Sequence, residues 1–130
     1  MFYIQHKAEE SLEDYLETIM LLTGKKADTH AIDIARELGF SKPSVSVALK
    51  NMREKKLVTV SADGIVALTD EGRDIAEKVY ERHMILTEWL ESLGVPGDIA
   101  EKDACRIEHD MSEISFDALK KSILEKRKDS

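Results

Sequence analysis

One stretch of the chain carries four side chains that commonly bind metal ions. Two carboxylates, a thiol and an imidazole follow one another as Glu101, Cys105, Glu108 and His109. Their offsets of 4, 7 and 8 residues place them on one stripe if the segment is helical. Such a stripe has few uses in packing and an obvious one as a set of ligands for a divalent cation. Taken alone, Cys105 is more often a small buried apolar residue than a ligand.

Three further candidate ligands come earlier in the chain. Asp14 and Glu17 are three residues apart and share a face of the first predicted helix, and His83 lies on a long helix. Each has a plainer alternative, because Asp14 follows Ser11 at capping-box spacing, Glu17 suits a solvated face, and a single histidine is usually a hydrogen-bonded residue. Together they would supply donors from three helices, in which carboxylates and imidazoles favour Mn²⁺ or Fe²⁺ and a thiolate favours softer metals.

Cys105 and His109 could instead be a nucleophile and its general base. Residues four apart on a helix can touch, which is the contact that such a pair needs. However, no glycine-rich loop or set of oxyanion donors accompanies them in the sequence. The neighbouring carboxylates would also disfavour the thiolate form of the cysteine. The sequence therefore favours a protein that is not an enzyme.

The elements that must position these residues fall into two halves. In the first half, apolar residues recur at spacings of three and four, and the period then changes to two around Asp63-Gly64, a strong hairpin signal. We predict helices over residues 7–23, 31–38 and 42–55, and strands over residues 57–60 and 65–68. We expect Asp28 or Thr29 to cap the second helix. This order is typical of a winged helix-turn-helix whose third helix enters the major groove.

The second half is predicted to be entirely helical. A long helix capped by Thr69 ends near Gly94, a second covers about 99–111, and a third is capped by Ser115 and runs to about residue 126. The expected fold is therefore mainly α, with a winged helix-turn-helix DNA-binding domain over residues 1–70. A helical dimerisation and metal-binding domain follows over residues 71–130. Candidates for dimer packing, or alternatively for the core of one subunit, are Ile85, Trp89, Leu90, Ile123 and Leu124.

The predicted recognition helix has side chains that suit DNA. The formal net charge of −7 argues against a polyanion as partner, but residues 41–56 hold five basic residues against one acidic residue. Lysines there could bind phosphate or guanine, and serines are small donors that permit close approach. The candidate DNA contacts are Thr29, Ser41, Lys42, Ser44, Ser46 and Lys50. The alternative is an ordinary solvated helix, and the wing, with Asp63 at its tip and no basic residue there, is a poor phosphate contact.

Length and composition limit the cellular setting. The 130 residues contain no apolar run of the roughly 20 residues that a membrane span needs. The N-terminal segment lacks the apolar core of a signal peptide, and a single cysteine fits a reducing compartment. We therefore expect a cytoplasmic protein.

Three blocks resemble the diphtheria-toxin-repressor family of metal-dependent regulators. They are residues 11–19, Arg82-His83 and residues 104–112, and the similarity extends over nearly the whole chain, including residues 41–46. The resemblance implies a homodimer that binds double-stranded operator DNA when loaded with Mn²⁺ or Fe²⁺ and represses metal-uptake genes. The alternative is a winged-helix regulator that is not controlled by metal.

The sequence resembles two branches of that family at once. Its short length and Asp14 look like the manganese-transport-regulator branch, because longer members continue into an SH3-like domain and iron-responsive members have methionine at this position. Cys105 matches the iron branch instead, where manganese regulators have glutamate, and Glu101 falls where the iron branch has an ancillary-site histidine. The resemblance therefore implies Mn²⁺ or Fe²⁺ without choosing between them.

Overall fold

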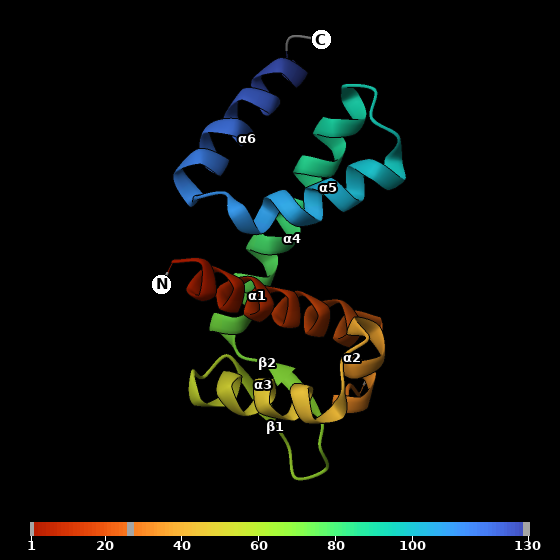
Figure 1. The fold of residues 1–130 in the computed structure, drawn as a ribbon, viewed down its shortest axis with the longest axis vertical. Helices are drawn as coiled ribbons and strands as arrows, with labels where there is room; N and C mark the ends of the chain where they lie inside the picture. The colour runs from red at the N-terminus through yellow and green to blue at the C-terminus, as the bar shows by residue number, and fades with distance from the viewer. Residues whose placement is uncertain (1, 26–27, 129–130) are drawn as a thin grey trace. The chain divides into compact units, whose positions relative to one another are not determined.

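The computed structural model describes residues 2–25 and 28–128, with side chains from residue 11 onward. Along these residues the elements are α1 (Phe2–Lys25), α2 (Ala31–Leu38), α3 (Lys42–Glu54), β1 (Val58–Val60), β2 (Val66–Leu68), α4 (Asp70–Ser92), α5 (Gly97–Asp110) and α6 (Glu113–Lys128) (Figure 1). The mainly helical content and the two-stranded hairpin confirm the predicted fold class. The chain divides into two compact units between Lys78 and Val79, inside α4. No helix among the described residues is long and apolar enough to cross a membrane.

The core of the first unit is built from one face of each of its helices. Leu16 and Ile19 of α1, Ile34 of α2, and Val45 and Met52 of α3 are each at most 1% exposed. Apolar residues three or four apart share a helix face, so this spacing turns one side of each helix inward. Burying a side chain of this kind stabilises the fold by about 1.5–3 kcal/mol. Consequently α3 is fixed by its inner face, and its outer face is open to solvent.

The wing is a short antiparallel hairpin that is fastened at its base. Its register pairs Val58 with Leu68 and Val60 with Val66. The hydroxyl of Thr69 donates to the carbonyl oxygen of Lys56 at 2.8 Å and accepts from the backbone N–H of Gly72 at 3.1 Å. Thr69 therefore caps α4, as predicted, and also closes the open end of the hairpin.

Two helix caps differ from the sequence predictions. Helix α2 has His30 as its N-cap, because the carboxylate of Asp33 accepts from the backbone N–H of His30 at 2.8 Å. The neighbouring Thr29 is instead fully buried, and its carbonyl oxygen accepts from Val66 N–H at 2.7 Å. For α6, the Ser115 backbone N–H donates to the hydroxyl of Ser112 at 3.2 Å. The α6 helix therefore begins at Glu113 with Ser112 as its cap, and the predicted cap at Ser115 is wrong.

The second unit joins the later part of α4 to α5 and α6. Its buried apolar residues are Val79, Leu86, Ala100, Ala104, Phe116 and Ile123. Two ion pairs connect α4 with α6 along the solvent side: Glu81 with Lys120 at 2.8 Å, and Glu88 with Arg127 at 2.6 Å. Exposed ion pairs of this type contribute only about 0–1 kcal/mol each. The unit therefore depends mainly on its apolar side chains and on the buried polar contacts described below.

Replacing Gly72 by alanine should destabilise the first unit by about 1–3 kcal/mol, as overpacked sites do. A Cβ at this position would collide with the backbone carbonyl oxygen of Leu57, which is held in place by the N–H of Thr69 at 3.0 Å. The measurement is urea unfolding followed by circular dichroism. The matched control is Gly24→Ala in α1, where a Cβ meets nothing within 4 Å. An equal free energy of unfolding for the two variants would contradict this account of Gly72.

Candidate metal centre and recognition helix

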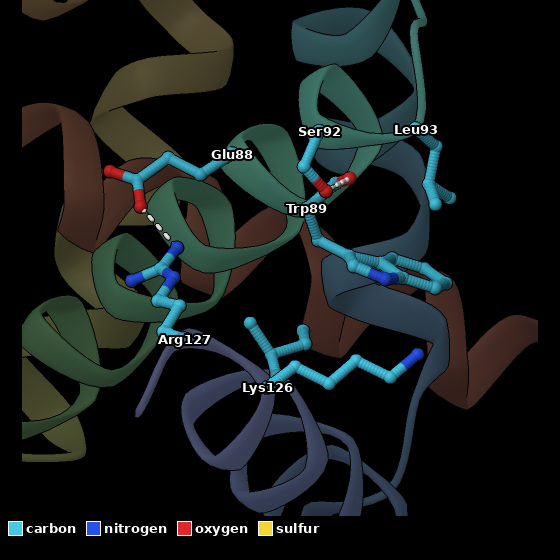
Figure 2. Close-up of a pocket in the computed structure, with 7 residues that line it drawn as sticks. Glu88, Trp89, Ser92, Leu93, Lys126 and Arg127 are labelled. Atoms are coloured by element: carbon cyan, nitrogen blue, oxygen red, sulfur yellow. Dashed lines mark hydrogen bonds and ion pairs between the residues drawn. The ribbon is translucent and has the colours of Figure 1, made fainter. Parts of the chain in front are cut away.

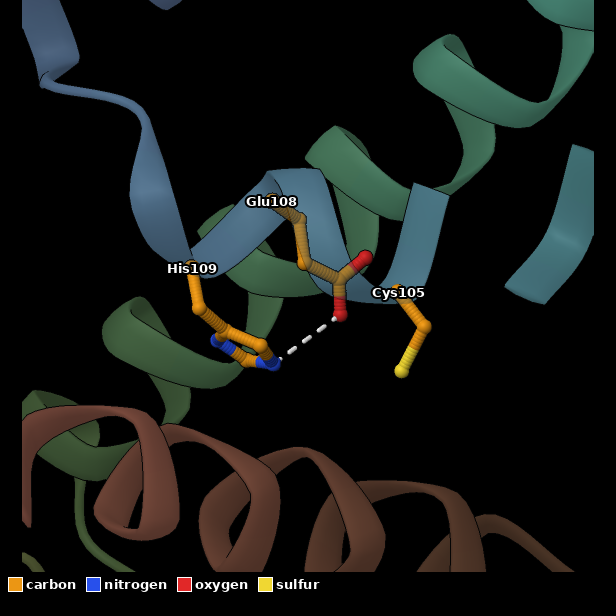
Figure 3. A group of neighbouring side chains, drawn as sticks. All are labelled: Cys105, Glu108 and His109. Atoms are coloured by element: carbon orange, nitrogen blue, oxygen red, sulfur yellow. Dashed lines mark ion pairs between the residues drawn. The ribbon is translucent and has the colours of Figure 1, made fainter. Parts of the chain in front are cut away.

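The last two turns of α5 bring a thiol, a carboxylate and an imidazole together. One ligand atom from each of Cys105, Glu108 and His109 lies within 4.8 Å of the other two (Figure 3). Glu108 and His109 are 1% and 6% exposed, whereas Cys105 is exposed. Glu108 is buried because it continues the stripe of Ala100 and Ala104, each four residues before the next. These three residues therefore share one face of α5, as predicted, and the carboxylate of Glu108 points inward.

His83 of α4 adds a second imidazole to this group. Its Nδ1 lies 3.0 Å from Oε2 of Glu108, and its Nε2 lies 3.8 Å from Oε1 of Glu101. On the other side, Nε2 of His109 lies 3.4 Å from Oε1 of Glu108. The buried carboxylate thus has an imidazole beside each of its two oxygens. Four of the five candidate ligands of the second unit, all except Cys105, are joined through these contacts.

The donor set of this group fits a divalent transition-metal ion. Imidazole nitrogen and carboxylate oxygen suit Mn²⁺, Fe²⁺ and Zn²⁺, and a thiolate adds preference for the softer metals. A buried carboxylate is also costly unless positive charge or hydrogen-bond donors compensate it. Glu101, with its side chain 69% exposed, and the exposed Cys105 stand at the solvent side of the group. Glu108, His109 and His83 are therefore its structural centre.

The two candidate ligands of the first unit lie on α1. Asp14 and Glu17 are both partly buried, and their spacing of three residues places them on one face of the helix. Asp14 lies in the interior of α1, which begins at Phe2, so the capping-box alternative for Asp14 is wrong. The helix offers two carboxylates side by side, which is an arrangement that hard divalent cations bind.

Arg82 holds the end of the α5 helix, a role that the sequence analysis missed. Its Nη1 donates to the carbonyl oxygens of Glu108 at 3.0 Å and of Met111 at 2.7 Å. Its guanidinium carbon lies 5.1 Å from the centre of the Phe116 ring. The last carbonyl groups of a helix have no partners within the helix, and a charged donor supplies them here. No spacing rule reveals this contact, because the acceptors are backbone atoms 26 and 29 residues away.

Arg82→Met should lower the free energy of unfolding by about 2 kcal/mol, the usual worth of hydrogen bonds from a charged donor. Methionine keeps much of the aliphatic stem and removes the guanidinium. The measurement is urea unfolding in the presence of a chelator, so that metal binding does not contribute. Lys120→Met is the matched control, because it removes a basic residue that pairs with the exposed carboxylate of Glu81. Equal losses in the two variants would show that the contacts of Arg82 with α5 carry no special weight.

The outer face of α3 carries most of the predicted DNA contacts. Ser41 caps the helix, since its hydroxyl accepts from the backbone N–H of Ser44 at 3.3 Å and donates to the hydroxyl of Ser44 at 2.9 Å. Lys42, Ser46 and Lys50 are exposed on the same helix. Thr29, in contrast, is 0% exposed, so its side chain has no access to a phosphate in this conformation. The burial of this side chain does not support the predicted DNA contact of Thr29, which stays a prediction.

Comparison with known protein families shows to which family the chain belongs. Residues 7–66 match the model of the iron dependent repressor N-terminal DNA binding domain, and residues 69–129 match the iron dependent repressor metal binding and dimerisation domain. The transcriptional regulator MntR of Escherichia coli O157:H7 is 36% identical over 111 residues, which are 85% of this chain and 72% of that protein. The chain belongs to the iron-dependent repressor family.

Further relatives include a second MntR protein and two solved regulators that are named for manganese. The HTH-type transcriptional regulator MntR of Geobacillus kaustophilus is 32% identical over 110 residues, 84% of this chain and 77% of that protein. A solved manganese-dependent transcriptional repressor in complex with manganese matches with a TM-score of 0.78 and 26% identity, over 86% of this chain and 52% of that one. The structure of the manganese regulator SloR matches with a TM-score of 0.75, 26% identity, and 86% and 53% coverage. The chain thus spans about half the length of these solved structures.

Membership of the iron-dependent repressor family confirms the class of protein predicted from the sequence. The members are transcriptional regulators whose first domain binds DNA and whose second domain binds metal and dimerises. Manganese and iron, the two metals predicted, are those after which the relatives and the family are named. The predicted resemblance is therefore correct at the level of the family.

The second unit also has a small pocket between the ends of α4 and α6. It has a volume of about 200 Å³, and its apolar walls come from Trp89, Leu93 and Ile123, with the Glu88–Arg127 ion pair at one edge (Figure 2). Pockets that hold small organic ligands usually measure about 300–1,000 Å³, so this one is undersized for such a ligand. Ile123 is 7% exposed and belongs to the core of its own unit, which supports the intramolecular alternative for that residue.

Proposed function

We propose that this chain is a metal-dependent transcriptional regulator that binds double-stranded operator DNA as a homodimer when Mn²⁺ or Fe²⁺ is bound. The genes that it represses would be those of metal uptake. The observation that carries this proposal is the buried carboxylate of Glu108 with His83 and His109 beside its two oxygens. The second domain of this family binds metal, and this group supports that role for the second unit.

The proposed metal ligands come from both halves of the chain. Glu108, His109, His83, Cys105 and Glu101 would supply donors from the second unit, and Asp14 and Glu17 would supply carboxylates from α1. The mixture of donor types supports this assignment, since divalent Mn and Fe accept both imidazole and carboxylate. The metal, when bound, supplies positive charge that lets these carboxylates share one site. An ion with ligands from α1 and α5 would favour one arrangement of the two units to the extent that it binds that arrangement better.

The proposed DNA contacts lie on the exposed face of α3. Lys42 and Lys50 would bind phosphate or guanine. The hydroxyl groups of Ser41, Ser44 and Ser46 would donate hydrogen bonds to the DNA backbone at close range. In a dimer, two such helices must lie about one duplex turn apart, roughly 34 Å, to enter successive major grooves. The ordering of the units by metal would therefore control DNA binding.

The remaining expectations follow from the same proposal. A DNA-binding regulator acts in the cytoplasm, where operator DNA is found, and has no need of catalysis by Cys105 and His109. We propose that the DNA-binding domain comprises residues 1–70 and that the dimerisation and metal-binding domain comprises residues 71–130.

Glu108→Gln should raise the metal concentration needed for DNA binding by at least about tenfold. Loss of a residue that only hydrogen-bonds to a metal ligand already lowers metal affinity by about this factor. Glutamine keeps the shape of the side chain and removes its negative charge. The measurement is anaerobic fluorescence anisotropy on a duplex selected from a randomised library by the wild-type protein with Mn²⁺, repeated with Fe²⁺, Co²⁺ and Zn²⁺. Glu77→Gln, at an exposed position of α4, is the matched control.

Two outcomes of this experiment would contradict the proposal in different ways. If the protein selects the same duplex equally well in the presence of a chelator, the chain is a winged-helix regulator without metal control. If Glu108→Gln and Glu77→Gln both respond to metal like the wild type, the regulator is metal-dependent but its site lies elsewhere.

A further inference from the structure

The outer face of α3 has an apolar residue at its centre. Val47 is 61% exposed, while Val45, Leu49 and Met52 of the same helix are at most 6% exposed. Successive residues of an α-helix are rotated by about 100°, so Val47 points almost directly away from the side formed by these three. Val47 therefore does not pack in the core of the first unit. Core packing does not explain why position 47 is apolar.

The surroundings of Val47 are polar and positively charged. Ser44 and Lys50 are its neighbours three residues before and after, and both are exposed. Single exposed apolar residues are common on protein surfaces and need no explanation by themselves. This one differs in its position, because it is flanked by cationic and hydroxyl side chains on a helix of the DNA-binding domain, residues 7–66. The negatively charged major groove of DNA attracts such side chains. In the proposed complex, Val47 would face the base edges at the floor of that groove.

We propose that Val47 determines base specificity by packing against the C5 methyl group of a thymine in the major groove. The proposal rests on the proposed function, in which α3 is the recognition helix. Valine has no hydrogen-bond donor or acceptor, so it takes no part in readout of the polar base edges. Thymine is the base that presents a methyl group in this groove. At any other base, the valine would cover polar atoms of the base edge without pairing them, which is unfavourable.

The shape of the valine side chain suits this role. A β-branched residue in a helix has one strongly preferred χ1 rotamer, so Val47 presents its methyl groups in a fixed direction before DNA arrives. Little side-chain entropy is lost when the contact forms, in contrast to the long side chain of the neighbouring Lys50. We assign phosphate and guanine contacts to the lysines and the thymine contact to Val47, one per half-site.

The test uses the metal-loaded full chain and a duplex selected from a randomised library, in which each thymine is replaced in turn by deoxyuridine. This replacement removes the C5 methyl group alone. At the thymine read by Val47, affinity should fall about fourfold per half-site, which corresponds to the ~0.8 kcal/mol of one buried methyl group. For Val47→Ala, thymine and deoxyuridine at that position should bind equally. Val47→Thr keeps one methyl group and should retain part of the preference.

Leu21→Ala is the matched control, since Leu21 is an exposed apolar residue of the first unit outside α3. It should discriminate thymine from deoxyuridine as the wild type does. Circular dichroism melting checks that Val47→Ala is folded. If the protein selects a duplex and no thymine shows a methyl effect that disappears in Val47→Ala, the inference is wrong while the proposed function remains intact. If no duplex is selected with any of the four metals, the proposed function fails and the inference fails with it.

Discussion

The buried carboxylate of Glu108 is the constraint on which the second unit depends. A carboxylate removed from water costs several kcal/mol unless compensated, and two imidazoles lie beside its oxygens. Consecutive residues of α4 hold both ends of Glu108: Arg82 binds its backbone carbonyl, and His83 lies against its side chain. This double contact fixes the end of α5, where His109 and Cys105 also project. The position of the proposed metal ligands is therefore set by helix capping as much as by the ligands themselves.

The fold was predictable from the sequence wherever one periodic signal dominated. The α2 helix has the predicted bounds, and the hairpin formed around Asp63-Gly64, because apolar periodicity and turn chemistry agree there. The caps of α2 and α6 were misplaced, since several hydroxyl and carboxylate residues compete at each terminus and only tertiary contacts choose among them. Thr29, one of the two predicted caps of α2, is instead buried, and its carbonyl oxygen accepts from the N–H of Val66 in the wing.

The candidate site was predictable in its residue types and only partly in its supporting contacts. The helical spacing of Cys105, Glu108 and His109 placed them on one face, and the structure brings their ligand atoms together. Arg82 acts on backbone atoms that no sequence pattern marks. Val47 was overlooked because a pattern search collects the apolar residues that fit the buried face and passes over the one that does not. On α3, the apolar residue that lies outside the buried face is the one that suggests a contact with a base.

The central proposal is that the buried carboxylate of Glu108 and the imidazoles beside it hold the metal ion. Crystals grown anaerobically with Mn²⁺, with the ion located by anomalous diffraction, test it most directly. The account predicts an ion bound by Glu108 together with His83 or His109. An ion bound elsewhere, with Glu108 outside its coordination shell, would contradict it.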